Sequence, residues 1–144
     1  MTKKFFVLAF SAAIIAFLLT PVIWPYAIDA AHMPPSSVLP FFMVVVALSE
    51  LAFGIGIAFL IFGYKAMRKA ERGYGLSFWA FLSTVWLLIS WWPHENLHRV
   101  SEGNYYALVW IEYIFHVSLY AAGVILALYL LKHFKALRPE NQNS

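Results

Sequence analysis

Histidine and glutamate side chains concentrate in one short part of this chain, where their spacing suits a metal ion. Three of the five histidines, His94, His98 and His116, lie there together with Glu112. Residues four positions apart share one face of a helix, so each of the pairs His94/His98 and Glu112/His116 presents both side chains in one direction. Imidazole and carboxylate together suit zinc, copper, iron or nickel. The sequence therefore predicts a transition-metal site formed by these four residues.

The first histidine pair belongs to a recognisable short motif. Residues 94–98 read HENLH and match the pattern H-E-x-x-H, which resembles the zinc-binding motif of the zincin metalloproteases. The resemblance covers five residues. It implies that the two histidines bind zinc, that Glu112 or His116 completes the site, and that Glu95 is a general base acting on the metal-bound water. A membrane-embedded metalloprotease with Glu95 as its catalytic residue is therefore one alternative.

The same histidines also fit two kinds of iron-containing site. A haem b between the helices would take His116 as one axial ligand and His94 or His98 as the other. The E-x-x-H spacing at residues 95–98 matches part of a di-iron motif, but the second E-x-x-H is missing because Glu112 and the histidine after it are four residues apart. We predict a site for a transition metal (zinc, copper or iron) or for haem b, and the choice stays open.

The composition of the chain is that of an integral membrane protein. It is 62% hydrophobic and 12% charged, about half of the ~25% charged residues of a soluble domain. So few polar residues cannot cover a protein in water, whereas lipid accepts an apolar surface. The chain has no cysteine, which excludes disulfide chemistry, thiolate ligands and thiol nucleophiles. No DNA-reading motif is present, and nucleic acid is not an expected partner.

Four apolar segments are long enough to cross a bilayer as helices, which takes about 20 residues each. We expect a single domain, residues 1–144, with spans at about 5–24, 38–67, 76–98 and 105–131 and a tail at 132–144. The first segment also fits a secretory signal peptide, but the small residues of a cleavage site are poorly met after it, so we expect it to be retained. The predicted fold is an all-α four-transmembrane-helix bundle with up-down-up-down topology.

The basic residues predict how this bundle lies in the membrane. They precede the first span, follow the second and follow the fourth, and Arg99 alone lies between the third and the fourth. Because Lys and Arg are enriched in cytoplasmic loops, both termini are expected in the cytoplasm. We therefore predict an inner or plasma membrane protein, N-in and C-in, whose His/Glu cluster lies in the extracytoplasmic half.

Two ionisable residues are predicted near the middle of the membrane. Glu50 and His116 each lie about 18 Å along their helices from the outer surface, at 1.5 Å per residue. A charged side chain at that depth costs roughly 2.5–3.5 kcal/mol or more. We therefore predict that Glu50 and His116 form a buried polar pair. Such a pair would also suit a small proton-coupled transporter, which is a second alternative.

The favoured function is a redox or other metal-dependent role for the His/Glu cluster. A third alternative requires no chemistry at all, namely an accessory subunit that stabilises a larger membrane complex. Besides the lipid bilayer, the candidate partners are therefore other membrane subunits or further copies of this chain. Whether the protein is an enzyme is left open by the sequence.

Overall fold

The computed structural model describes residues 2–24, 34–70, 75–101 and 104–137. The described part of the chain holds four helices, α1 (Lys3–Ile23), α2 (Leu39–Ala70), α3 (Leu76–Val100) and α4 (Tyr105–Leu137). All four are long and apolar enough to cross a membrane. The prediction of an all-α protein with four such segments is therefore confirmed.

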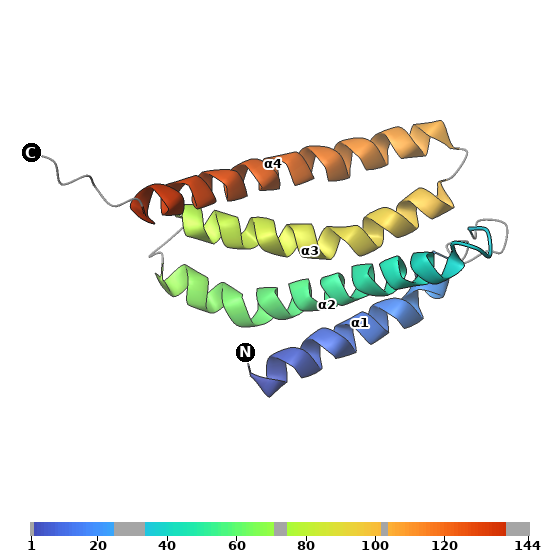
Figure 1. Ribbon diagram of the computed structural model, residues 1–144, viewed down its shortest axis with the longest axis horizontal. Helices are drawn as coiled ribbons and strands as arrows, with labels where there is room; N and C mark the ends of the chain where they lie inside the picture. The colour runs from blue at the N-terminus through green and yellow to red at the C-terminus, as the bar shows by residue number, and fades with distance from the viewer. Residues whose placement is uncertain (1, 25–33, 71–74, 102–103, 138–144) are drawn as a thin grey trace, which may run out of the picture.

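The helices lie side by side in the order α1, α2, α3, α4, and consecutive helices run in opposite directions (Figure 1). Substantial packing joins each helix to the next along the chain, and among the described residues it does not join α1 to α4. The bundle is therefore open, with α1 and α4 at its two edges. A closed bundle would also have packed the first helix against the last.

Two helices extend further than the apolar spans predicted from the sequence. α2 continues to Ala70 and α4 to Leu137, through the basic residues that follow each span. Hydrophobicity marks the part of a helix that faces lipid, whereas backbone hydrogen bonding continues until a cap or turn interrupts it. α3 passes through Pro93 and ends only at Val100, so the whole HENLH segment is helical.

Small residues let α1 and α2 approach each other closely. Ala9 of α1 and Ala58 of α2 are almost fully buried and form a core cluster with Phe5. A Cβ atom on Gly54 would overlap the backbone carbonyl oxygen of Ala9 and lie 2.9 Å from the backbone nitrogen of Ala13. Helices in membranes associate through such small-residue contacts, because lipid provides no hydrophobic drive for them to pack.

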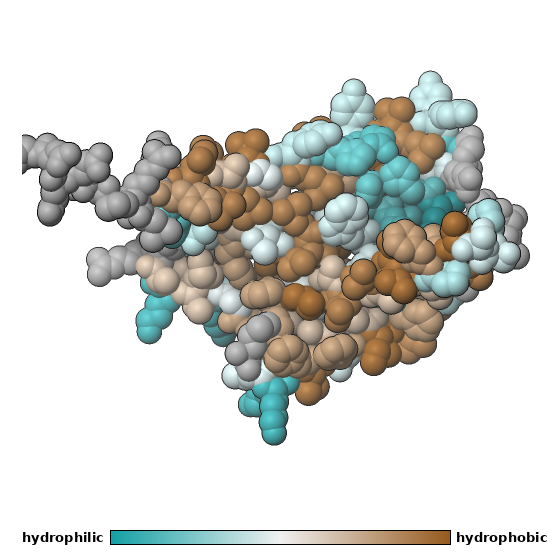
Figure 2. Space-filling view, viewed as in Figure 1, coloured by the Kyte–Doolittle hydropathy of each residue, from teal (hydrophilic) through white to brown (hydrophobic). Residues whose placement is uncertain are grey.

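The outer surface of the helices is apolar along most of its length. Large apolar side chains such as Val7, Val22, Phe41 and Trp110 are exposed on it. Soluble monomers rarely expose large continuous apolar surfaces, whereas lipid accepts them. Figure 2 shows hydrophilic residues gathered where α3 and α4 meet, toward the end of the molecule that carries the C-terminus of α3. The predicted cluster belongs to the same two helices.

Candidate metal centre

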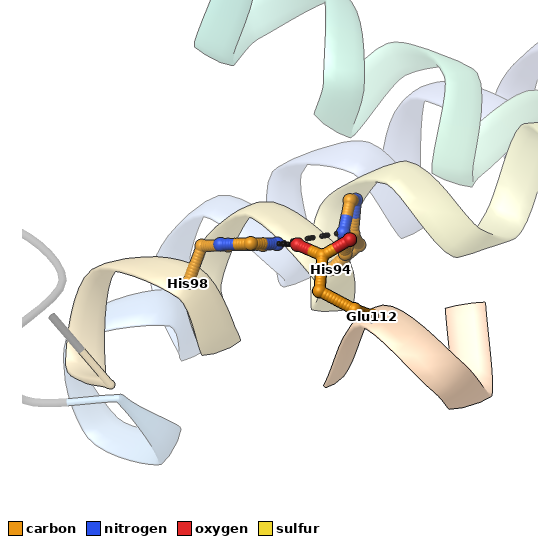
Figure 3. Close-up of side chains that lie close together, drawn as sticks. All are labelled: His94, His98 and Glu112. Atoms are coloured by element: carbon orange, nitrogen blue, oxygen red, sulfur yellow. Dashed lines mark hydrogen bonds and ion pairs between the residues drawn. The ribbon is translucent and has the colours of Figure 1, made fainter. Parts of the chain in front are cut away.

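His94, His98 and Glu112 converge between α3 and α4. The two histidines project from successive turns of α3, and Glu112 reaches across from α4 (Figure 3). One ligand atom from each of the three residues lies within 4.8 Å of the others. His98 Nε2 is 2.9 Å from His94 Nε2 and 3.2 Å from Glu112 Oε1.

The two separations that involve His98 are close to those required around a single metal ion. With metal–nitrogen bonds of about 2.0–2.1 Å, two ligands of a tetrahedral site lie about 3.3–3.4 Å apart. The 3.2 Å between His98 and Glu112 meets this value. The 2.9 Å between the two imidazoles is shorter and corresponds to an N–H···N hydrogen bond. A small ring rotation would exchange that hydrogen bond for two metal bonds, so the donor set fits an ion.

His116, the fourth predicted ligand, joins the cluster through Glu112. It lies one turn further along α4, and its Nδ1 forms an ion pair with Glu112 Oε2, while Oε1 of the same carboxylate contacts His98. The His116 ring also lies 5.1 Å from the ring of His94, centroid to centroid. The structure thus brings all four predicted residues together, with one carboxylate between two histidines.

The cluster is accessible from one side. The side chains of His98 and Glu112 are 36% and 45% exposed, and that of His116 is 39% exposed. Structural zinc sites are closed by four protein ligands, whereas catalytic sites keep a position for water or substrate. A partly exposed set of ligands leaves room for such a position.

Two aromatic side chains, Phe115 and Trp86, pack next to the cluster, and the sequence analysis had not identified them. Phe115 is buried, packs 5.0 Å from the His94 ring and stacks on Trp86. The Trp86 indole Nε1–H donates a hydrogen bond to Ser118 Oγ of α4 at 2.9 Å. The spacing held a signal for this packing, because Trp86 lies two turns before His94 on the same face of α3.

Glu95 lies on a different face of α3 from the two histidines that flank it in the motif. Its carboxylate accepts a hydrogen bond from Ser49 Oγ of α2 at 2.9 Å and forms an ion pair with Arg99. Neighbouring helical positions are about 100° apart around the axis. Glu95 is therefore directed toward α2, while His94 and His98 meet α4. In this structure the carboxylate of Glu95 is thus engaged by Ser49 and Arg99.

The structure does not bring Glu50 and His116 together. Glu50 is buried on α2, beside α1 and α3, and His116 is paired with Glu112 on α4. Among the described residues, no hydrogen bond or ion pair joins the two. Equal depth along two helices does not imply contact, and here α3 lies between α2 and α4 (Figure 1). The two residues that a proton relay would need are on opposite sides of α3.

A second feature, which the sequence analysis had not predicted, is a cavity of about 420 Å³ lined by residues of α1, α2 and α3. Glu50 and Glu95 line it, and so does Asn96, whose Nδ2 donates a hydrogen bond to the Trp92 carbonyl oxygen at 2.8 Å. The Asn96 Oδ1 atom is buried and has no hydrogen-bond partner. Polar residues inside an apolar span were the available signal, but a cavity depends on side-chain packing, which spacing does not reveal.

Comparison with known proteins adds no family to this description. No protein-family model, no curated protein and no solved structure matches the chain. The functional argument therefore depends on the geometry of the site, and the chain is described by what that geometry supports: a membrane-type four-helix protein with a His/Glu group close enough to bind a metal ion.

Proposed function

We propose that this protein is a membrane metalloprotein that binds one transition-metal ion through His94, His98 and Glu112. The observation that carries the proposal is the convergence of three ligand atoms from two helices within 4.8 Å of one another. His116 has a positioning role in this scheme, because its contact with Glu112 Oε2 leaves Oε1 directed at the histidines. Partners of this kind orient a metal ligand and commonly change affinity by about 10–100-fold.

The close packing of the imidazoles favours an ion over a haem. The centroid of the His94 ring lies 4.5 Å from that of the His98 ring and 5.1 Å from that of the His116 ring. Two axial ligands of a haem must stand on opposite faces of the macrocycle, and rings in mutual contact leave no space for one between them. Two histidines with one carboxylate are the ligands of catalytic zinc sites and of non-haem Fe(II) sites. We therefore rank zinc and Fe(II) above copper.

The partial exposure of the cluster favours a metal-dependent reaction over a purely structural ion. Three protein ligands leave at least one coordination position free, and the exposed sides of His98 and Glu112 give access to it. In the proposed role, an external molecule or a water occupies that position. Zinc would polarise it or lower the pKa of the bound water, whereas Fe(II) would support redox chemistry.

The first prediction tests metal binding directly. The purified full-length protein is stripped with a chelator and titrated with Zn²⁺ or Fe²⁺ against a chromophoric competitor. We expect one ion per chain, and an affinity at least about 100-fold lower in His98→Gln and in Glu112→Gln, because each loses a direct ligand. Binding should also weaken as the pH falls, since protons compete with the metal for imidazole and carboxylate.

Two control variants make this test specific. His133→Gln removes an exposed histidine whose Nδ1 lies 3.1 Å from the Tyr129 carbonyl oxygen on α4. Glu95→Gln removes a carboxylate that lies on another face of α3. Both should bind metal like the unaltered protein. The proposal would be refuted if the protein bound no stoichiometric metal, or if all four variants lost metal affinity equally. Loss of a proteolytic activity in Glu95→Gln alone would favour the metalloprotease.

A further inference from the structure

The cavity between α1, α2 and α3 has the size and position of a small-molecule site. Its volume of about 420 Å³ lies within the ~300–1,000 Å³ of typical ligand pockets. Phe17, Leu18 and Met43 line it and are also exposed on the apolar outer surface. The cavity therefore opens toward the surface that faces lipid, and a molecule dissolved in the bilayer could enter it from the side.

One buried hydrogen-bonding atom in the cavity wall, Asn96 Oδ1, has no partner in the described part of the chain, and Asn96 is only 2% exposed. The carboxyl group of Glu50, a residue that is 7% exposed, also lines the cavity. Buried polar groups are nearly always satisfied in folded proteins, and an exception calls for an unseen partner. Both groups accept hydrogen bonds, so a complementary ligand must offer donors.

The rest of the wall is mostly apolar and includes three aromatic side chains, and two of its charged residues pair with each other. Phe17, Phe42 and Trp92 line the cavity, and the Trp92 indole Nε1–H is held by a hydrogen bond to Thr20 Oγ1 at 2.9 Å. Arg99 pairs with Glu95 and lies over the Phe42 ring at 4.7 Å. Flat aromatic walls favour a planar ring in the ligand. The Glu95–Arg99 pair leaves no unbalanced charge from these two residues, which favours a neutral ligand over an ion.

We propose that this cavity binds a neutral, membrane-soluble aromatic hydroxyl compound of the hydroquinone class. The ring lies among the aromatic side chains, its hydroxyl groups donate to Asn96 Oδ1 and Glu50, and its apolar tail extends toward the exposed side. The site lies on the other face of α3 from His94 and His98, so the proposal is independent of metal binding. It concerns binding alone and includes no redox step.

A matched pair of ligands tests the proposal on the unaltered protein. The full chain in lipid nanodiscs, freed of metal with EDTA and kept anaerobic, is unfolded thermally at increasing mole fractions of decylhydroquinone or of its dimethyl ether. A ligand that binds the folded state raises the melting temperature, from which an apparent Kd follows. The ether keeps the shape and loses both donors. We expect the hydroquinone to bind at least about tenfold more tightly, the effect of one hydrogen bond to a buried acceptor.

Variants in the wall locate the binding. Asn96→Leu keeps the side-chain volume and removes the acceptor. The ratio of the apparent Kd of the ether to that of the hydroquinone should therefore fall to about one. Val46→Phe fills the cavity and should abolish binding, whereas Val45→Phe alters an exposed neighbour outside this cavity and should not. If Asn96→Leu does not fold, the ligand pair and the two valine variants decide.

Four outcomes would overturn the proposal. Equal binding of the hydroquinone and its ether would mark the cavity as an apolar crevice filled by lipid tails. Tighter binding of decylamine than of either would assign the site to a cation held by Glu50. Lack of any saturable stabilisation, or equal effects of Val45→Phe and Val46→Phe, would show that this cavity is not the binding site.

Discussion

Glu112 links the two helices of the cluster at the level of a single side chain. One of its carboxylate oxygens contacts His98 on α3, and the other contacts His116 on its own helix. The cluster could be predicted from spacing alone, because each of the pairs has the i, i+4 separation that aligns side chains on a helix. The pairing of Glu50 with His116 could not be judged in this way, since equal depth says nothing about the direction in which a side chain points.

The separation of Glu50 from His116 leads to a prediction about coupling. Glu50→Ala and His116→Ala should each change the free energy of unfolding, and the double variant should show the sum of the two changes within about 0.5 kcal/mol, because residues that share no partner act independently. Glu112→Ala combined with His116→Ala is the matched pair in direct contact, and its changes should not add. The measurement is equilibrium unfolding in detergent. A coupling above 1 kcal/mol between Glu50 and His116 would mean that they meet after all.

At the level of the helix, α3 carries different chemistry on different faces. Its histidines meet α4, whereas Glu95, Asn96 and Arg99 line the cavity with α1 and α2. Apolar length was sufficient to predict four helices, because a span must satisfy its own backbone hydrogen bonds in lipid. The order in which the helices pack was not predictable, since segments of similar hydrophobicity do not reveal their neighbours. The cavity was missed because it depends on how side chains fill the space between three helices.

The contact between α1 and α2 provides a prediction at this scale. Gly54→Ala should destabilise the protein by about 1–3 kcal/mol, since its Cβ would overlap backbone atoms of Ala9 and Ala13, which cannot rotate away. Gly123→Ala on α4 is the control, because a Cβ there meets nothing within 4 Å. It should be neutral or slightly stabilising, as alanine favours a helix over glycine. Thermal unfolding of both variants in the same detergent compares them, and equal melting temperatures would contradict the close α1–α2 contact.

The open arrangement has a consequence for the whole molecule. Because α1 and α4 do not close the bundle, α4 packs substantially against α3 alone among the described helices. Aromatic side chains on its other faces are exposed, among them Tyr106, Trp110 and Tyr120. Lipid can cover such a surface, and so can another membrane subunit or a second copy of the chain, which stay predictions. Either way, the partly exposed metal cluster lies at the edge of the bundle, where an external molecule can reach it.

The last prediction concerns which side of the membrane the cluster faces. Lys3 and Lys4 begin α1, and Arg68 and Lys69 lie in the last turn of α2. These helix ends lie at the same end of the molecule as the C-terminus of α4, opposite the C-terminus of α3 and the N-terminus of α4 (Figure 1). Because basic residues are retained in the cytoplasm, a fluorescent reporter fused after Ser144 should be active inside the cell.

A reporter that is active only outside the cytoplasm should be active when it is inserted at Gly103. The same reporter inserted at Gly73 is the control and should be inactive, because this position is expected in the cytoplasm. Arg99 does not weigh against this orientation, because its charge is balanced by the ion pair with Glu95. With this orientation the His/Glu cluster draws its metal from outside the cytoplasm. The reverse pattern of reporter activity would instead expose the cluster to the cytoplasmic metal pool, and the source of the ion would have to be reassigned.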